Sequence, residues 1–341
     1  MPIRIGIIGC GMWGQKYVRV FDELLESQVT AVCDQDETRL KIIRQRYPQV
    51  EFFKSHSDLL TYGNIDAVVV ATQATSHYGM TRAALMAHKH VLVEKPFVLE
   101  NREGQDLIEL AERNKLTLMV GHVFLYNSGI RKLKQYLGDG GHGIGDVYYL
   151  YATRTSLGPI RNDVNVVWDL ATHDISIFSY LLNEQPHHAS AKAAKVLRNC
   201  REDVAFITLT YPNGVIANIH VSWADPNRVR EVVIVGSQKR VVFDDIEMLE
   251  KVRVYEKSVV CSGKDTESFG EFVLSMRDGD IISPKVEMSE PLQNQCNHFI
   301  ECIRQRVKPL TDGQNGLEVV KVINAIQESI RNDGTNVEVP I

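Results

Sequence analysis

The chain has 341 residues, of which 44% are hydrophobic and 24% are charged, and its formal net charge is −5. This is the composition of an ordinary globular protein with a large core, and the length suits two domains of roughly 150 residues each. Scattered basic residues in an acidic chain argue against a nucleic-acid partner, and no apolar run approaches the roughly 20 residues of a membrane helix.

The first fourteen residues form the most informative stretch. An apolar run, Ile3–Ile8, predicts a strand, and it leads into a G-x-G-x-x-G turn at residues 9–14 and then into a helical pattern. In such a turn Gly9 permits the tight bend, Gly11 lets phosphates approach the backbone, and Gly14 lets the helix pack close to the strand. The helix N-terminus then offers N–H groups and a partial positive charge to an anion. The turn therefore predicts a dinucleotide site.

An acid follows at the expected distance. A second apolar run, Val29–Cys33, ends at Asp34, which lies twenty residues after Gly14. A carboxylate there can accept both ribose hydroxyls of NAD and would repel the 2′-phosphate of NADP. Because Arg39 lies further along the next predicted helix, we expect it to be too far away to compensate easily, and we predict NAD as the cofactor.

Strands and helices continue to alternate through the first third of the chain. The predicted segments are helix 36–47, a short capped helix at 57–60, strand 67–71, a helix ending at His88, strand 90–93, helix 101–114 and strand 116–120. Repeated β-α units of this kind predict a doubly wound parallel sheet. We assign residues 1–122 to this Rossmann domain.

The pattern changes after residue 122. A helix is predicted at 127–137, a strand at 147–156 and a helix at 168–182, and strand-like runs with turns at 211–214, 224–227 and 236–238 follow from about residue 190. Helices at about 292–306 and 317–330 close the chain. We expect residues 123–341 to form an α+β domain with an open, mainly antiparallel sheet, which makes the whole chain α/β.

The six cysteines contain no C-x-x-C pair, and no charged-then-apolar leader precedes the first strand. We therefore expect free thiols, a cytoplasmic location and no metal site.

Lys95 is the first candidate for chemistry. It follows strand 90–93 in Glu94-Lys95-Pro96, at the carboxyl end of a strand, where open α/β sheets bind their ligands. A lysine beside a nicotinamide ring would have a lowered pKa, which suits proton transfer or polarisation of a hydroxyl. The cofactor-binding set that we predict from these motifs is Gly9, Gly11, Met12, Trp13, Gly14, Asp34, Thr72, His77, Glu94 and Lys95.

A second candidate pair lies in the predicted helix 168–182. Asp169 and His173 are four residues apart, which places both on one face of an α-helix. The acid could orient the imidazole as in a catalytic triad, or the pair could be a satisfied histidine at a domain interface. From spacing alone these two interpretations are equally supported. A metal site is not indicated, because no third ligand appears at helical spacing.

Residues that precede this pair could contact a sugar nucleotide. Arginines suit phosphate recognition because their guanidinium groups donate paired hydrogen bonds, although Arg154 and Arg161 could equally be ordinary surface charges. The predicted substrate-binding set, which includes the catalytic candidates, is Lys95, Tyr126, Asn127, Arg154, Arg161, Asn165, Trp168, Asp169 and His173.

Taken together, these motifs resemble the Gfo/Idh/MocA oxidoreductases along essentially the whole chain. The marks of the resemblance are the glycine turn, Asp34, Glu94-Lys95-Pro96 and the Asp169/His173 pair, with Glu290-Pro291-Leu292 and His298-Phe299-Ile300-Glu301 near the end. The resemblance implies that Lys95 is the catalytic lysine, that His173 is the acid/base and that Asp169 completes a triad. Either Lys95 or His173 could take the substrate's hydroxyl proton.

One branch of the family is similar in more detail. Gly158-Pro159-Ile160-Arg161, Asp163-Val164-Asn165 and residues 168–174 resemble members that act on nucleotide-linked sugars, although Asn127-Ser128 stands where many members have Asn-Pro. The resemblance implies NAD-dependent oxidation of the 3-hydroxyl of a nucleotide-linked sugar, most simply UDP-N-acetylglucosamine, to the 3-keto sugar.

The alternatives are a nucleotide-ketosugar reductase, a uronate 3-dehydrogenase, an inositol-type polyol dehydrogenase and a non-catalytic NAD-binding sensor. A sensor has no need of Lys95, Asp169 and His173 together, which favours an enzyme. An uncovered sheet face predicts a homodimer or homotetramer, and the uphill oxidation predicts a downstream enzyme, such as an aminotransferase, that consumes the ketone.

Overall fold

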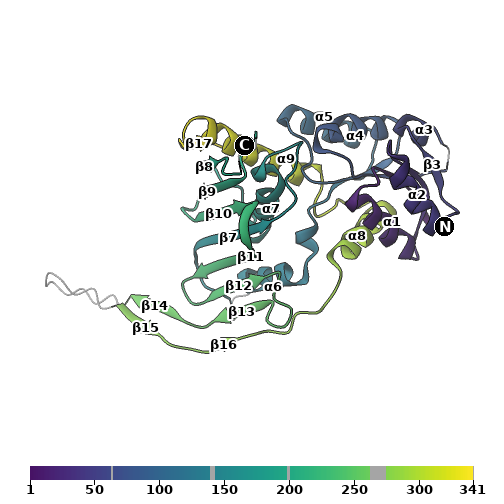
Figure 1. The fold of residues 1–341 in the computed structure, drawn as a ribbon. Coiled ribbons are helices and arrows are strands. Elements are labelled where there is room, and N and C mark those ends of the chain that lie inside the picture. Colours follow the sequence, from purple (N-terminus) through teal and green to yellow (C-terminus); the bar gives the residue numbers. More distant parts are fainter. Residues whose placement is uncertain (63, 139–142, 198–199, 262–273, 341) are drawn as a thin grey trace. The chain divides into compact units, whose positions relative to one another are not determined.

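The computed structural model describes the chain except residues 63, 139–142, 198–199, 262–273 and 341 (Figure 1). It divides into two compact units that are not continuous in sequence. Unit 1 contains residues 1–126, 162–164 and 289–324, and unit 2 contains residues 127–161, 165–288 and 325–341. The units therefore do not follow the predicted division at residue 122 throughout, because residues 162–164 and 289–324 cluster with unit 1. No described helix has the length and apolar character needed to cross a membrane.

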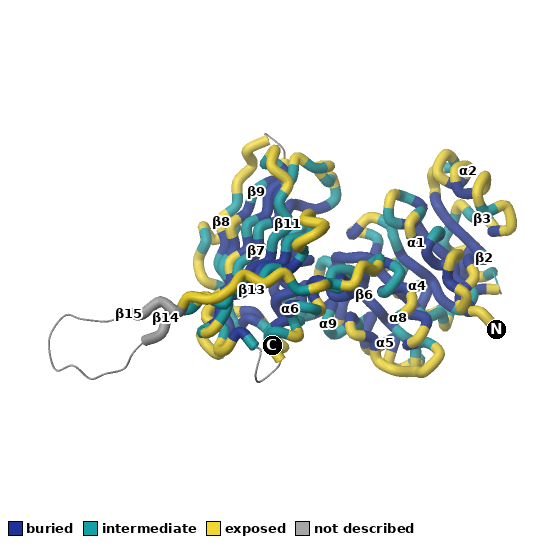
Figure 2. The backbone as a smooth tube through the Cα atoms, turned by 90° about the horizontal axis from the view of Figure 1, so that it is seen from below, coloured by how far each residue is buried: buried dark blue, intermediate teal, exposed yellow. Residues whose placement is uncertain are grey.

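Unit 1 is built on a six-stranded parallel sheet in the order β3-β2-β1-β4-β5-β6. This strand order is that of the dinucleotide-binding Rossmann fold and confirms the predicted doubly wound sheet. The central strands are buried on both faces, as their continuous apolar runs require (Figure 2). The strands are β1 (Ile3–Ile8), β2 (Ser27–Cys33), β3 (Glu51–Phe53), β4 (Ala67–Val70), β5 (His90–Val93) and β6 (Leu118–Val120).

Helices connect these strands close to the predicted positions. They are α1 (Met12–Glu23), α2 (Glu37–Arg46), α3 (His56–Thr61), α4 (His77–Met86) and α5 (Asn101–Arg113). The side chain of Asp36 caps α2 by accepting a hydrogen bond from the Thr38 N–H, and basic residues occupy the last turn of that helix. Both features stabilise helix ends, which explains why this highly charged segment is helical.

The late segment 289–324 completes the core of unit 1. Helix α8 (Pro291–Gln305) packs against α1, and the rings of Phe21 and Phe299 meet edge to face with centroids 6.4 Å apart. Residue 311 then pairs with the edge strand: the Val120 N–H donates to the Thr311 carbonyl, and the Thr311 hydroxyl donates to the Val120 carbonyl, both at 2.7 Å. The helix α9 (Gly313–Arg331) begins four residues earlier than predicted.

Unit 2 contains a nine-stranded mixed sheet in the order β16-β13-β12-β11-β7-β10-β9-β8-β17. All neighbouring strands are antiparallel except β7 and β10, which are parallel, so the prediction of a mainly antiparallel sheet is confirmed. The strands are β7 (Val147–Leu157), β8 (His188–Ala194), β9 (Val204–Thr210), β10 (Ile216–Ser222), β11 (Ala224–Gly236), β12 (Arg240–Asp244), β13 (Val252–Tyr255), β16 (Ile281–Ile282) and β17 (Val337–Glu338). A separate hairpin pairs β14 (Ser258–Cys261) with β15 (Leu274–Arg277).

Two of the three predicted turns in this sheet are confirmed. Gly214, at φ +84°, closes the β9–β10 hairpin, and residues 236–238 join β11 to β12. The turn predicted at 224–227 is wrong. Those residues belong to β11, and the Asp-Pro-Asn sequence is accommodated as an irregularity in the pairing with β7 between Ala224 and Val229.

Helices α6 (Ser128–Gly138) and α7 (Thr172–Leu182) also belong to unit 2. A π-helical turn, Val167–Ala171, runs directly into α7, so the predicted helix 168–182 is present but is not α-helical throughout. Almost every residue of α7 is buried, including His173 and Asp174. Because π-helical turns occur frequently at functional sites, Val167–Ala171 is a candidate part of the active site.

Candidate active site

The glycine turn of unit 1 has the geometry that a pyrophosphate requires. Gly9 has φ +92°, and a Cβ on Gly14 would lie 1.8 Å from the Gly9 carbonyl oxygen, so both positions demand glycine. A Cβ on Gly11 would instead face open space, where the Arg39 Nη1 at 3.9 Å is its nearest neighbour. Gly11 is the N-cap of α1, and no described side chain caps this helix end. The turn therefore has both the room and the N–H donors for a dinucleotide phosphate.

Asp34 lies beside this turn at the end of β2. Its carboxylate accepts hydrogen bonds from the backbone N–H groups of Cys10, at 2.6 Å, and Asp36, at 2.8 Å. These bonds hold the acid against the first glycine of the motif, in the place where the fold binds an adenosine ribose.

The expectation that Arg39 is too far from this acid is wrong. Arg39 extends back from the first turn of α2, and its Nη1 lies 3.5 Å from Asp34 Oδ2, while its Nε lies 3.4 Å from Asp36 Oδ2. The long side chain of Arg39 reaches back to Asp34, which lies five residues earlier in the sequence. Arg39 therefore borders the adenosine site.

The other predicted cofactor residues of unit 1 differ in exposure. Met12 is exposed, Trp13 carries the ammonium group of Lys16 over its ring at 4.4 Å, and Thr72 accepts a hydrogen bond from the hydroxyl of Ser76. His77 is only 1% exposed, and its ring nitrogens contact the carbonyl oxygens of Pro96 and Thr72 at 2.7 and 3.3 Å. His77 thus joins the loops that follow β4 and β5 and positions the loop that carries Lys95.

Glu94 belongs to a buried polar network. Its carboxylate accepts hydrogen bonds from the Tyr17 hydroxyl at 2.7 Å and from the Lys95 N–H at 3.1 Å, while the Gln295 amide donates to Tyr17 at 2.9 Å. Burial and the neighbouring Glu94 raise the pKa of Tyr17 well above its usual value, so Tyr17 remains a donor. The network fixes the backbone immediately before Lys95 from α1 on one side and α8 on the other.

His122 is a residue of this region that sequence reasoning missed. It follows β6 by two residues and is 1% exposed, and neither ring nitrogen has a hydrogen-bond partner within the described part of the chain. Burial, and next the charge of Lys95, lower its pKa to about 3, so the ring is neutral at physiological pH. Val93 pairs with Val120, so the ends of β5 and β6 lie side by side. The sequence pointed to His122 only through its place two residues after a predicted strand of this sheet.

Unit 2 presents the second candidate group. Asp169, in the π-helical turn, accepts hydrogen bonds from the Arg161 Nη1 at 3.3 Å and the Trp223 Nε1 at 3.2 Å. Arg161 is thus an ion-pair partner of Asp169, and the buried Trp223 is a contact that sequence reasoning missed. His173 lies in the first turn of α7, where its backbone carbonyl accepts a bond from the Ser176 hydroxyl.

Arg154 does not have the position expected of a phosphate ligand. Its guanidinium donates three hydrogen bonds of 2.7 to 3.2 Å to the carboxylate of Asp174, and both side chains are almost completely buried. This bidentate pair fixes α7 onto β7 and leaves Arg154 a structural role.

Four other predicted substrate contacts are also enclosed by the protein. Tyr126 is fully buried, with its hydroxyl 3.3 Å from that of Thr311, and Trp168 is 9% exposed. The Asn165 amide donates to Glu202 and Gln327 and accepts from the Trp168 N–H, so it stabilises the π-helical turn. Asn127 caps the start of α6 and donates to Asp245 at 3.2 Å. Burial and these contacts argue against Tyr126 and Asn165 as sugar ligands.

The Rossmann sheet, the glycine turn and the acid at the end of β2 define a dinucleotide-binding protein. Residues 3–122 match the family described as "Oxidoreductase family, NAD-binding Rossmann fold", and residues 130–242 match the "GFO/IDH/MocA C-terminal domain". The chain therefore belongs to the Gfo/Idh/MocA family and is an NAD-dependent dehydrogenase. The family match also confirms the predicted cofactor, NAD.

Named relatives are similar along much of the chain. A D-apiose dehydrogenase of Paraburkholderia graminis is 25% identical over 97% of this chain and 88% of its own length. A UDP-N-acetylglucosamine 3-dehydrogenase of Acidithiobacillus ferrooxidans is 29% identical over 64% of this chain and 67% of its own length. The WlbA dehydrogenase of Bordetella pertussis, solved with NADH and UDP-GlcNAcA, superposes with a TM-score of 0.81 at 20% identity, and the match covers all of both chains, which shows a shared fold.

The placement of Asp34 predicts a preference for NAD over NADP. Asp34→Ala should weaken NAD binding by about 10- to 100-fold, because the ribose loses a charged hydrogen-bond acceptor. Discrimination against NADP should fall in the same variant, because the carboxylate that repels the 2′-phosphate is removed and Arg39 loses one of its two carboxylate partners. Calorimetric titration of both cofactors tests this, with Asp106→Ala, which removes a half-exposed acid of the same unit, as the control. Tighter binding of NADP by the wild type, or unchanged NAD affinity in Asp34→Ala, contradicts the assignment.

Proposed function

We propose that this enzyme oxidises the 3-hydroxyl of a nucleotide-linked sugar, most simply UDP-N-acetylglucosamine, to the 3-keto sugar. The observation that carries the proposal is the similarity to a UDP-N-acetylglucosamine 3-dehydrogenase, at 29% identity over two thirds of that protein. The full-length similarity to a D-apiose dehydrogenase supports a second candidate, oxidation of a free sugar.

We assign the acid–base chemistry to Lys95 and His173. Bound NAD supplies the hydride acceptor. The oxidised carbinol must also lose its hydroxyl proton, and a neutral imidazole accepts a proton readily near neutral pH. His173 therefore takes the proton, and the Lys95 ammonium polarises the hydroxyl. Asp169 is held by Arg161 and Trp223 in the turn that precedes His173. We assign to Asp169 the role of orienting the imidazole without transferring a proton.

A panel of sugar nucleotides and free sugars with NAD tests the substrate, followed by absorbance of the reduced cofactor. Oxidation of a secondary alcohol by NAD is uphill at neutral pH, so the ketone should be trapped with an aminotransferase and the new amine located by NMR. We expect the amine at the 3-position and loss of most turnover with free N-acetylglucosamine, because binding energy from the nucleotide orients the sugar. An amine at the 4-position, or turnover with free sugars alone, contradicts the proposal.

We also propose that the protein is a homodimer or homotetramer that pairs through the nine-stranded sheet. The outer face of this sheet carries half-exposed apolar side chains that a second copy could cover: Tyr149, Phe206 and Ile216. Sedimentation analysis should give a mass at least twice that of the 38.5 kDa chain, and a monomer at micromolar concentration contradicts the proposal.

The buried free thiols Cys10, Cys33, Cys296 and Cys302 support a reducing, cytoplasmic location.

A further inference from the structure

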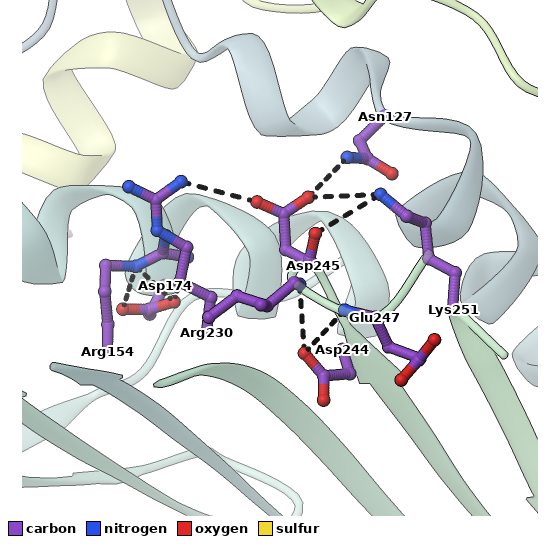
Figure 3. Close-up of polar contacts among 9 residues, drawn as sticks. Asn127, Arg154, Asp174, Arg230, Asp244, Asp245, Glu247 and Lys251 are labelled. Carbon is purple, nitrogen blue, oxygen red and sulfur yellow. Dashed lines mark hydrogen bonds and ion pairs between the residues drawn. The ribbon is translucent and has the colours of Figure 1, made fainter. Parts of the chain in front are cut away.

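Two arginines face each other across neighbouring strands of unit 2. Arg154 on β7 and Arg230 on β11 are directly opposite in the antiparallel register, and Figure 3 shows their guanidinium groups side by side. Like charges directly opposite each other destabilise a sheet unless something compensates them. Asp174 compensates Arg154, as described above. The same compensation is not available to Arg230.

Arg230 has much weaker contacts. Within the described part of the chain its side chain makes one hydrogen bond, from Nη1 to Asp245 Oδ2 at 3.4 Å, and that side chain is 37% exposed. Charge-assisted bonds between nitrogen and oxygen are usually 2.7 to 2.9 Å long. A guanidinium has five N–H donors, so most of the hydrogen-bonding capacity of Arg230 is unused by the described residues.

A lysine lies on the other side of the same acid. Lys251 Nζ donates to Asp245 Oδ1 at 3.5 Å and to the Asp245 carbonyl at 3.4 Å, and Asn127 donates to the same Oδ1 at 3.2 Å (Figure 3). The nearby acids Asp244 and Glu247 are turned elsewhere, because their carboxylates accept backbone N–H groups of their own turn. Asp245 is therefore shared loosely between two cations.

The local charge balance is positive. Burial lowers the pKa of Arg230, and the charges of Arg154 and Arg228 lower it further, whereas the charge and the hydrogen bond of Asp245 raise it. A part-buried excess of cationic donors is the arrangement in which a protein binds an anion. These cations also lie close to His173. Arg154 pairs with Asp174, which directly follows His173 in α7.

We propose that Arg230 and Lys251 form an anion-binding subsite that holds the negatively charged group of the substrate while His173 acts on its sugar ring. Phosphate and carboxylate groups both present negatively charged oxygens that accept hydrogen bonds from arginine and lysine. The subsite therefore suits the pyrophosphate of a sugar nucleotide or the carboxylate of a uronate. This inference rests on the proposed function, since an uncharged sugar offers nothing for these side chains to bind.

Calorimetric binding of UDP and of D-glucuronate to the NAD-bound enzyme tests the subsite without turnover. Arg230→Gln should weaken binding of the recognised anion by about 10- to 100-fold, the usual effect of losing a hydrogen bond to a charged group. Lys251→Gln should act in the same direction, and Arg230→Lys should recover part of the affinity. Lys192→Gln is the matched control, because it removes an exposed cation from β8, at a distance of several strands, and should change nothing.

The two probes separate the sources of the anion. Binding of UDP alone identifies a nucleotide subsite, and binding of glucuronate alone identifies a carboxylate subsite. Unchanged affinity in Arg230→Gln, equal losses in Lys192→Gln, or binding of neither probe by the wild type overturns the inference. Thermal unfolding of each variant must match the wild type, and the Arg230→Lys result decides the matter if Arg230→Gln is destabilised. Wild-type UDP binding without oxidation of UDP-N-acetylglucosamine would instead count against the proposed function alone.

Discussion

Lys95→Met is expected to lower turnover by about 10²–10⁴-fold, the usual contribution of a positioned acid–base group. Methionine keeps the apolar stem of the side chain but removes the ammonium group, so hydroxyl polarisation is lost while the fold is preserved. Affinity for NAD should stay within a few fold, since Lys95 follows β5 and the adenosine site lies at Asp34, directly after β2. Steady-state rates and calorimetric NAD binding measure the two effects separately.

Lys54→Met provides the control, because it removes an exposed lysine of the same unit. His173→Asn should lose turnover to a similar extent as Lys95→Met, and Asp169→Asn should lose less because Asp169 orients the imidazole. If Lys95→Met or His173→Asn keeps turnover within about threefold of wild type, far from the acid–base range, the role given to that residue is wrong.

Asp174→Asn is expected to reduce the free energy of unfolding by about 3–5 kcal/mol. The variant removes the negative charge that accepts three hydrogen bonds from the guanidinium of Arg154, at a site where both side chains are at most 5% exposed. Urea unfolding followed by circular dichroism measures the loss. Replacing both residues by apolar ones, as in Arg154→Met/Asp174→Leu, should recover much of it, because the two buried charges are then removed together.

Asp333→Asn makes the same chemical change in an exposed pair with Lys192 and should have little effect, since solvent screens such pairs. A value for Asp174→Asn as small as that of Asp333→Asn would mean that the buried pair does not hold α7 on its sheet.

The fold could be predicted where local patterns determine it. Apolar runs, the glycine turn and helix caps lie within short windows, and they identified the Rossmann sheet and most helices. The parallel pairing of β7 with β10 could not be predicted, because it joins strands more than fifty residues apart without a local signal. The segment 224–227 misled the prediction because Asp-Pro-Asn favours a turn, whereas β11 absorbs it as an irregularity.

The site could be predicted only at the level of residue type. Arginines suit phosphate, but Arg154 is bound to Asp174, twenty residues away, and this pairing is a property of the folded sheet. Arg39 seemed remote in sequence because a count of residues ignores the reach of its side chain toward Asp34. Arg230 and His122 have no motif of their own, and their environments arise from register and burial.

The contribution of residues 289–324 to unit 1 has a consequence for how the protein matures during translation. The ribosome finishes β6 early, but the strand's edge and the outer side of α1 receive their packing partners, Thr311 and Phe299, only near the end of synthesis. About 200 residues separate Tyr126 from Asn324, which is a delay of roughly 10–40 s at common elongation rates. During that interval the apolar surface of the nascent nucleotide-binding unit that these residues later cover is exposed to solvent.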